Sequence, residues 1–201
     1  MGLRDILTGR HQVKGPAPDR LFAITTAYVD LQAEHHVDPS GSAAIVFQAL
    51  ATSEFESTIK DMEEVVTATG GDNGTTVRTE DDSFGYRWMI LRSPAGAPSV
   101  EDLAVGINAV SSSIETAGFG ERLLCAVFGF TDAGTAGKAG GQRIYFIYNY
   151  KRGAWYPFVP APGDAQERSV ERELQLKAQV GNELPVEAEI ERWFPLWGIP
   201  I

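Results

Sequence analysis

The sequence feature that most constrains the fold is the nearly continuous apolar run from Leu123 to Phe130. A strand with one wet face alternates apolar and polar residues, whereas a strand buried on both faces is apolar almost throughout. The run is far shorter than the roughly eighteen residues that a membrane span requires. We therefore predict that it forms the central strand of a sheet covered on both sides. Cys125 lies inside the run and is the only cysteine, so we expect a structural core thiol, no internal disulfide and a reducing compartment.

Patterns on either side of this run predict the other elements of an α+β fold. Alternation and enrichment in β-branched and aromatic residues predict strands over residues 24–33, 43–51, 75–80, 84–92 and 143–150. The first two strands are expected to form a hairpin around the turn residues Asp38-Pro39-Ser40-Gly41. Capping residues followed by apolar positions at helical spacing predict helices over residues 53–70, 99–118 and 164–181.

The chain is predicted to form a single α+β domain over residues 19–201, preceded by a short N-terminal segment, residues 1–18. In that segment Leu3, Ile6 and Leu7 lie on one face of a predicted helix, and Gly15 to Pro18 form a hinge. This helix docks on the domain or contacts another protein or a membrane surface. We expect a mostly antiparallel sheet flanked by helices, with an aromatic C-terminal tail. The element order α-β-β-α-β-β-α resembles that of type III secretion chaperones and the YbjN group.

Charge and composition exclude several classes of function. The 201 residues carry a formal net charge of −10, which disfavours binding to nucleic-acid backbones. The N-terminus lacks the apolar core of a signal peptide, and no transmembrane segment is predicted. His11, His35 and His36 are too few and too badly spaced to predict a metal site, and no cofactor is expected.

No complete catalytic constellation is evident in the chain. The acidic groups Asp61-Glu63-Glu64 and Glu80-Asp81-Asp82 lie on the solvent side of a predicted helix and in a predicted turn, so they are expected to be solvated. The glycine-rich loop from Thr131 to Gly141 lacks the Gly-Lys-Ser/Thr ending and the following helix of a phosphate-binding loop. We therefore predict a protein that is not an enzyme. One alternative is a small hydrolase or transferase that uses a carboxylate pair near Lys151 and Arg152.

Aromatic residues are concentrated in the last 57 residues, which hold ten of the twenty, in blocks at 145–158 and 192–197. Such residues serve equally as core and as anchors for a partner. We predict that the two blocks pack together, with Trp193 and Trp197 near Trp155 and Tyr156, because exposing all of these rings would be costly. The candidate partner-binding residues are Tyr150, Lys151, Arg152, Trp155, Trp193 and Trp197, with Lys151 and Arg152 at an exposed rim.

Several segments together resemble the PspA-associated protein family called PspAB. They are MGLRDIL at residues 1–7, DSFGYRW at 82–88, AGFG at 117–120, YNYKRGAWYPF at 148–158, LPVE at 184–187 and ERWFPLWG at 191–198. The resemblance implies a cytoplasmic accessory protein linked with PspA, the membrane-associated helical protein of the phage-shock envelope-stress response. It implies a protein partner, and the family has no established catalytic residues to carry over to this sequence. A chaperone that shields a helical client is a further alternative, suggested by the fold analogy.

Overall fold

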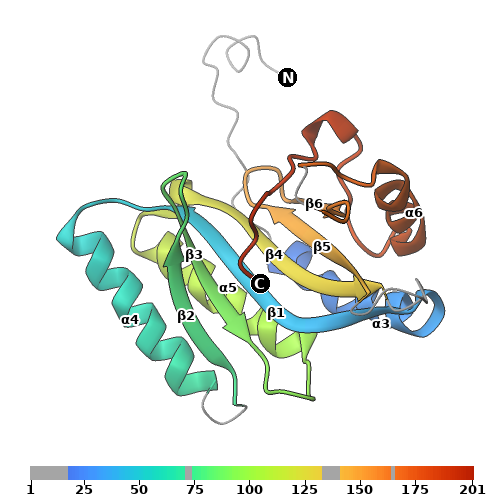
Figure 1. The fold of residues 1–201 in the computed structure, drawn as a ribbon. Coiled ribbons are helices and arrows are strands. Elements are labelled where there is room, and N and C mark those ends of the chain that lie inside the picture. Colours follow the sequence, from blue (N-terminus) through green and yellow to red (C-terminus); the bar gives the residue numbers. More distant parts are fainter. Residues whose placement is uncertain (1–17, 71–73, 133–140, 164–165) are drawn as a thin grey trace, which may run out of the picture.

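The protein is built on one six-stranded antiparallel sheet with the strand order β2-β3-β1-β4-β5-β6 (Figure 1). The computed structural model describes residues 18–70, 74–132, 141–163 and 166–201. The strands are β1 (Val37–Gln48), β2 (Thr76–Asp81), β3 (Tyr86–Arg92), β4 (Leu123–Asp132), β5 (Gln142–Asn149) and β6 (Ala154–Phe158). The helices are α2 (Pro18–Phe22), α3 (Ile24–His35), α4 (Ser53–Gly70), α5 (Val100–Thr116) and α6 (Val170–Val180), with 3-10 turns η1 (Gly120–Arg122) and η2 (Ile190–Arg192). The predicted α+β class is confirmed.

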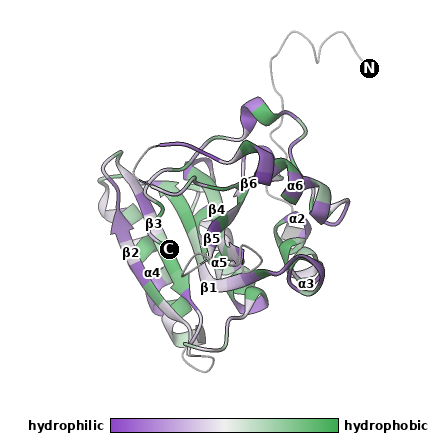
Figure 2. Ribbon diagram, turned by 45° about the vertical axis from the view of Figure 1, so that its right-hand side comes forward, coloured by the Kyte–Doolittle hydropathy of each residue, from purple (hydrophilic) through white to green (hydrophobic). Residues whose placement is uncertain are grey.

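The two faces of the sheet are covered by different kinds of structure. The helices pack on one face around a large apolar core. Residues 184–201 form a largely irregular segment that first runs beside β6, where Val186 bridges to Trp155, and then crosses the other face (Figure 1). Hydropathy colouring shows apolar residues gathered where the helices meet the strands (Figure 2). A second, smaller core lies under the C-terminal segment and contains Val46, Trp88, Cys125, Tyr156 and Trp193.

The predicted central strand is confirmed. β4 lies between β1 and β5 and pairs with both strands. Cys125 lies opposite Val46 of β1 on one side and opposite Asn149 of β5 on the other. Side chains of β4 enter both cores, because alternate residues of a strand point to opposite faces. This double burial explains why the run is apolar at almost every position.

The predicted helices over residues 53–70 and 99–118 are present as α4 and α5. In α5 the Ser99 hydroxyl accepts a hydrogen bond from the Asp102 N–H at 3.1 Å, which satisfies one of the free donors at the helix start. Its buried positions Leu103, Ile107, Val110 and Ile114 recur at helical spacing. The third predicted helix starts later than expected, at Val170 after Ser169, and residue 164 lies outside the described residues.

The strand predicted over residues 24–33 is wrong, because this segment forms helix α3. Its buried residues Ile24, Ala27 and Leu31 lie three and four apart, so packing against the core overrides the strand preference of its β-branched residues. The predicted hairpin is therefore also wrong. β1 starts at Val37 and runs through the expected turn, with a register shift between Pro39 and Ala43.

The two adjacent histidines, His35 and His36, lie at the end of α3. His35 is the last helical residue, and His36 adopts a left-handed conformation, φ 55°, that ends the helix. The N-terminal segment predicted over residues 1–18, with His11, lies outside the described residues apart from Pro18. The same holds for residues 133–140 of the glycine-rich loop.

Candidate functional site

The six candidate partner-binding residues divide into buried and accessible groups. Tyr150, Trp155 and Trp193 are buried, so their side chains are part of the core and present no surface to a partner. Lys151 and Arg152 are exposed on the turn between β5 and β6, as predicted. Trp197 is half-buried and packs against the second core.

The two aromatic blocks pack together, but only through one side of β6. The Tyr156 hydroxyl donates a hydrogen bond to the Phe194 carbonyl at 3.1 Å. The rings of Phe158 and Trp197 meet edge to face, with their centroids 5.1 Å apart. Trp155 points to the opposite face of the sheet, where its indole N–H donates to the Arg20 carbonyl at 2.7 Å. The prediction that the Trp193–Trp197 block packs near Tyr156 is therefore confirmed. The prediction that it packs near Trp155 is wrong, because neighbouring strand residues point to opposite faces.

Trp193 is held in place by polar contacts on three sides. Its indole N–H donates to the Glu187 carbonyl at 3.0 Å, and its own carbonyl accepts a hydrogen bond from Arg168 at 2.6 Å. The Lys177 ammonium lies 5.5 Å from the centroid of the Trp193 ring, within the range of a cation–π contact. These contacts attach the C-terminal segment to α6 and fix it across the sheet.

Arg168 also forms an ion pair with the fully buried Glu173 of α6, at 2.6 Å. The Glu173 carboxylate also accepts a hydrogen bond from the Val159 N–H at 2.9 Å. Sequence reasoning missed this pair. A signal was present, because Glu173, Leu176 and Val180 share one helical face, where an acidic residue in an apolar stripe indicates a buried partner.

The turn between β5 and β6 presents its two cations differently. The N–H groups of Arg152 and Gly153 both donate to the Asn149 carbonyl, at 3.2 and 2.8 Å, so the turn has a fixed backbone. Arg152 forms an ion pair with Glu187 at 2.9 Å and is thereby partly neutralised. Lys151 makes no ion pair with any residue that the structure describes, and it is the cation that the turn leaves available.

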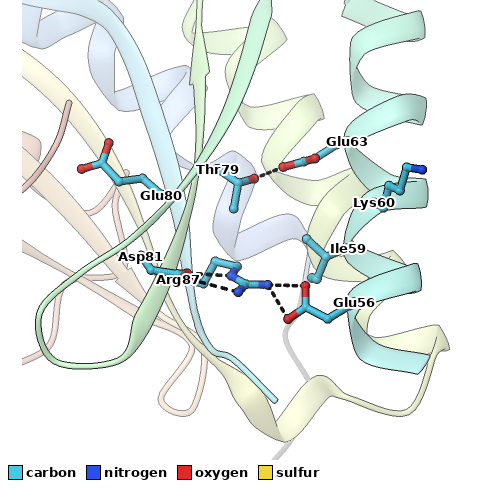
Figure 3. Close-up of a pocket in the computed structure, with 8 residues that line it drawn as sticks. All are labelled: Glu56, Ile59, Lys60, Glu63, Thr79, Glu80, Asp81 and Arg87. Atoms are coloured by element: carbon cyan, nitrogen blue, oxygen red, sulfur yellow. Dashed lines mark hydrogen bonds and ion pairs between the residues drawn. The ribbon is translucent and has the colours of Figure 1, made fainter. Parts of the chain in front are cut away.

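A hollow of about 230 Å³ lies between α4 and β2, and charged side chains line most of it (Figure 3). Arg87 sits at its centre and holds Asp81 through two nitrogens, at 2.7 and 3.1 Å, and Glu56 of α4 at 2.7 Å. The Thr79 hydroxyl donates to the Glu63 carboxylate. Lys60 and Glu80 point away from this group (Figure 3).

The charged groups around this hollow have a structural role, because they hold secondary-structure elements together. Hydrogen bonding from Arg87 holds the pKa of Asp81 below its usual range, and the same bond raises the pKa of Arg87. Both groups therefore stay charged and paired, and neither is placed to exchange a proton near neutral pH. Across the described residues, no group of three or more His, Cys, Asp or Glu side chains could hold a metal ion. The ion pairs of Arg87 thus fasten α4 to the β2–β3 hairpin.

A second hollow, of about 300 Å³, lies between the C-terminal segment and the ends of β5 and β6. Tyr145, Phe158 and Trp197 give it aromatic walls, and Arg143 supplies a cation. Burial raises the pKa of Tyr145, which keeps its hydroxyl protonated. The residues that line it include no nucleophile beside a general base.

The fold and surface define a class of α+β protein in which a helix-backed antiparallel sheet is closed on its other face by its own C-terminal segment. The family model described as PspA associated protein B, PspAB, matches residues 1–201, so the chain belongs to the PspAB family, as its resemblance to that family indicated. The family name implies an association with PspA. No curated protein and no solved structure is significantly similar to the chain. Within the described residues, no helix is both long and apolar enough to cross a membrane.

Proposed function

We propose that this protein is a non-enzymatic accessory protein that binds PspA in the cytoplasm as part of the phage-shock envelope-stress response. The family name supports PspA as the partner, and the lone buried Cys125 agrees with a reducing compartment. The paired state of the carboxylates around Arg87 supports a binding role over an acid–base one.

The binding surface that we propose lies at one end of the sheet. Strand registers bring four parts of the chain to this end: the β2–β3 turn, the end of β1, the start of β4 and the β5–β6 turn. We call this the sheet-end surface, and it is the upper-left end of the sheet in Figure 1.

The observation that carries the proposal is the exposure of Lys151 on a turn of fixed backbone. Buried aromatic residues, Tyr150 before the turn and Trp155 after it, hold this turn from both sides. The chain has a net charge of −10, so an available cation is a local exception that a carboxylate on a partner can recognise. Electrostatic pairing of this kind sets orientation and association rate as well as affinity.

The test is a measurement of binding between the purified protein and PspA, with Lys151→Glu as the variant. Lys60→Glu is the matched control, because Lys60 is also exposed but lies on α4. Arg152 is left unchanged, since its reversal would also leave Glu187 beside a second carboxylate. We expect Lys151→Glu to weaken binding by roughly tenfold, with the loss shrinking at high salt, and Lys60→Glu to have little effect. Equal affinities for wild type and Lys151→Glu would show that the turn does not contact PspA.

A further inference from the structure

The β2–β3 turn presents an aromatic ring to solvent. Phe84 is 73% exposed, which makes it the most exposed large apolar side chain in the described part of the chain. The neighbouring Tyr86 is 40% exposed. The alternation of Phe84, Tyr86, Trp88 and Ile90 predicts a strand, but β3 starts only at Tyr86 and leaves Phe84 in the turn. A ring in this position contributes nothing to either core.

The Asp82 side chain holds this turn in one conformation. Its Oδ1 accepts hydrogen bonds from the N–H groups of Phe84 and Tyr86, at 2.8 and 2.9 Å. Its Oδ2 accepts a third bond, from the Trp88 indole N–H at 3.0 Å. Trp88 is buried in the second core, so the position of Phe84 is tied to the interior of the protein.

The hairpin that carries this turn is also fastened from the other side. Arg87 joins Asp81 at the end of β2 to Glu56 of α4, as Figure 3 shows. Gly85 takes a positive φ of 83°, a conformation that residues with a side chain rarely adopt. The side of Gly85 on which a side chain would lie faces open space. The turn therefore projects into solvent from a rigid base.

We propose that Phe84 is a hydrophobic anchor that inserts into an apolar pocket, bordered by cationic groups, on PspA. This inference rests on the proposed function and names a second contact of the same sheet-end surface. An aromatic side chain already held in position loses little conformational freedom on binding, and such residues dominate interface energetics. Glu80, Asp81 and Asp82 place three carboxylates near the turn. Arg78 pairs with Glu80 and Arg87 pairs with Asp81, so one negative charge is left over and the border of the pocket is expected to be basic.

The spacing of the two contacts suits one partner. Phe84 and Lys151 lie at the same end of the sheet, on two hairpins that are separated by β1 and β4. Neighbouring strands are about 4.8 Å apart, which places the two turns on the order of 15–20 Å from each other. A single protein surface can reach both, with an apolar pocket at one place and carboxylates at the other.

The experiment compares the affinity of wild type, Phe84→Ala and Phe194→Ala for purified PspA. Phe194 is the matched control, because it is 57% exposed and lies in the C-terminal segment, away from the β2–β3 turn. We expect Phe84→Ala to weaken binding by about 30-fold or more, the loss that defines a hot spot, and Phe194→Ala by less than about twofold. A photo-crosslinking amino acid in place of Phe84 should form a covalent link to PspA, and the same group in place of Phe194 should not.

The outcomes separate this inference from the proposed function. If wild type binds PspA and Phe84→Ala binds equally well, the anchor is refuted and the association with PspA stands. Equal losses for both variants would likewise refute a specific anchor. If wild type itself fails to bind purified PspA, the proposed function falls and this inference falls with it. A large drop in the melting temperature of Phe84→Ala would show that the ring supports the fold, and would also overturn the inference.

Discussion

At the scale of single residues, Glu173 shows how a charged side chain fits into the interior. It has no exposed surface, and its carboxylate is matched by the Arg168 guanidinium and the Val159 N–H. Removing one partner of a buried pair leaves the other without compensation, which costs more than the pair contributes. Because Arg168 also binds the Trp193 carbonyl, the pair links α6 to the C-terminal segment.

We expect Glu173→Gln to lower the free energy of unfolding by about 3 kcal/mol, the lower part of the range for a broken buried pair, since Arg168 keeps some access to water. Glu171→Gln, an exposed neighbour on the same helix, is the control and should change this free energy by less than about 0.5 kcal/mol. Chemical denaturation measures both variants. Equal stabilities would show that the pair contributes nothing.

At the scale of elements, the C-terminal segment covers one face of the sheet although it is irregular apart from the 3-10 turn η2. Leu196, Trp197, Ile199 and Ile201 pack against the second core, and Arg78 and Arg92 reach the Pro200 carbonyl at 3.0 and 3.4 Å. Its side chains are exposed or half-buried except for those of Leu184, which lies in the helix-side core, and Trp193, which is enclosed in the second core. Trp193 is therefore the residue on which the attachment of the segment depends.

Trp193→Ala is expected to cost about 3–5 kcal/mol of unfolding free energy, because it leaves a cavity and removes the indole hydrogen bond to Glu187. Its sequence neighbour Phe194 offers an internal comparison. Phe194→Ala should be close to neutral, because that ring is mostly in water. Thermal melts of both variants would decide the matter, and similar melting temperatures would contradict the assigned burial.

The elements that sequence patterns predicted well are those with a strong local signal. The capped helices α4 and α5 and the apolar strand β4 each have a pattern that packing reinforces. Helix α3 was missed because its β-branched residues favour a strand locally, and only the core contacts of Ile24, Ala27 and Leu31 favour a helix. At the candidate site, the exposure of Lys151 was predictable from the turn sequence. The pairing of Arg152 with Glu187 was not, because it depends on how a distant segment folds back.

At the scale of the whole molecule, the sheet separates two cores that share no buried side chain, although the half-buried Val186 packs against both. The helix-side core is large and is closed by several elements, whereas the second core depends on one irregular segment. Cys125 belongs to the second core, and its thiol is a natural reporter of whether that core is closed. Burial raises the pKa of this thiol to about 12.

Below that pKa the Cys125 thiol stays protonated, so at pH 8 a thiol reagent should modify the native protein slowly, and rapidly once denaturant unfolds it. If the C-terminal segment controls access, Trp193→Ala should speed the native reaction, whereas Phe194→Ala should not. The time course of labelling, followed by mass spectrometry, gives the rates. Fast labelling of the wild-type protein would refute the burial of this strand.

The dependence of the second core on the C-terminal segment also affects how the protein is made. The last strand of the sheet ends at Phe158, and Trp193 follows 35 residues later. A ribosome that adds about 5–20 residues per second needs about 2–7 s to synthesise this stretch. During that interval the sheet can form on its helix side while its other face lacks a cover. The nascent protein therefore passes through a stage with an open apolar sheet face, and this is the stage at which we expect it to be most prone to aggregation.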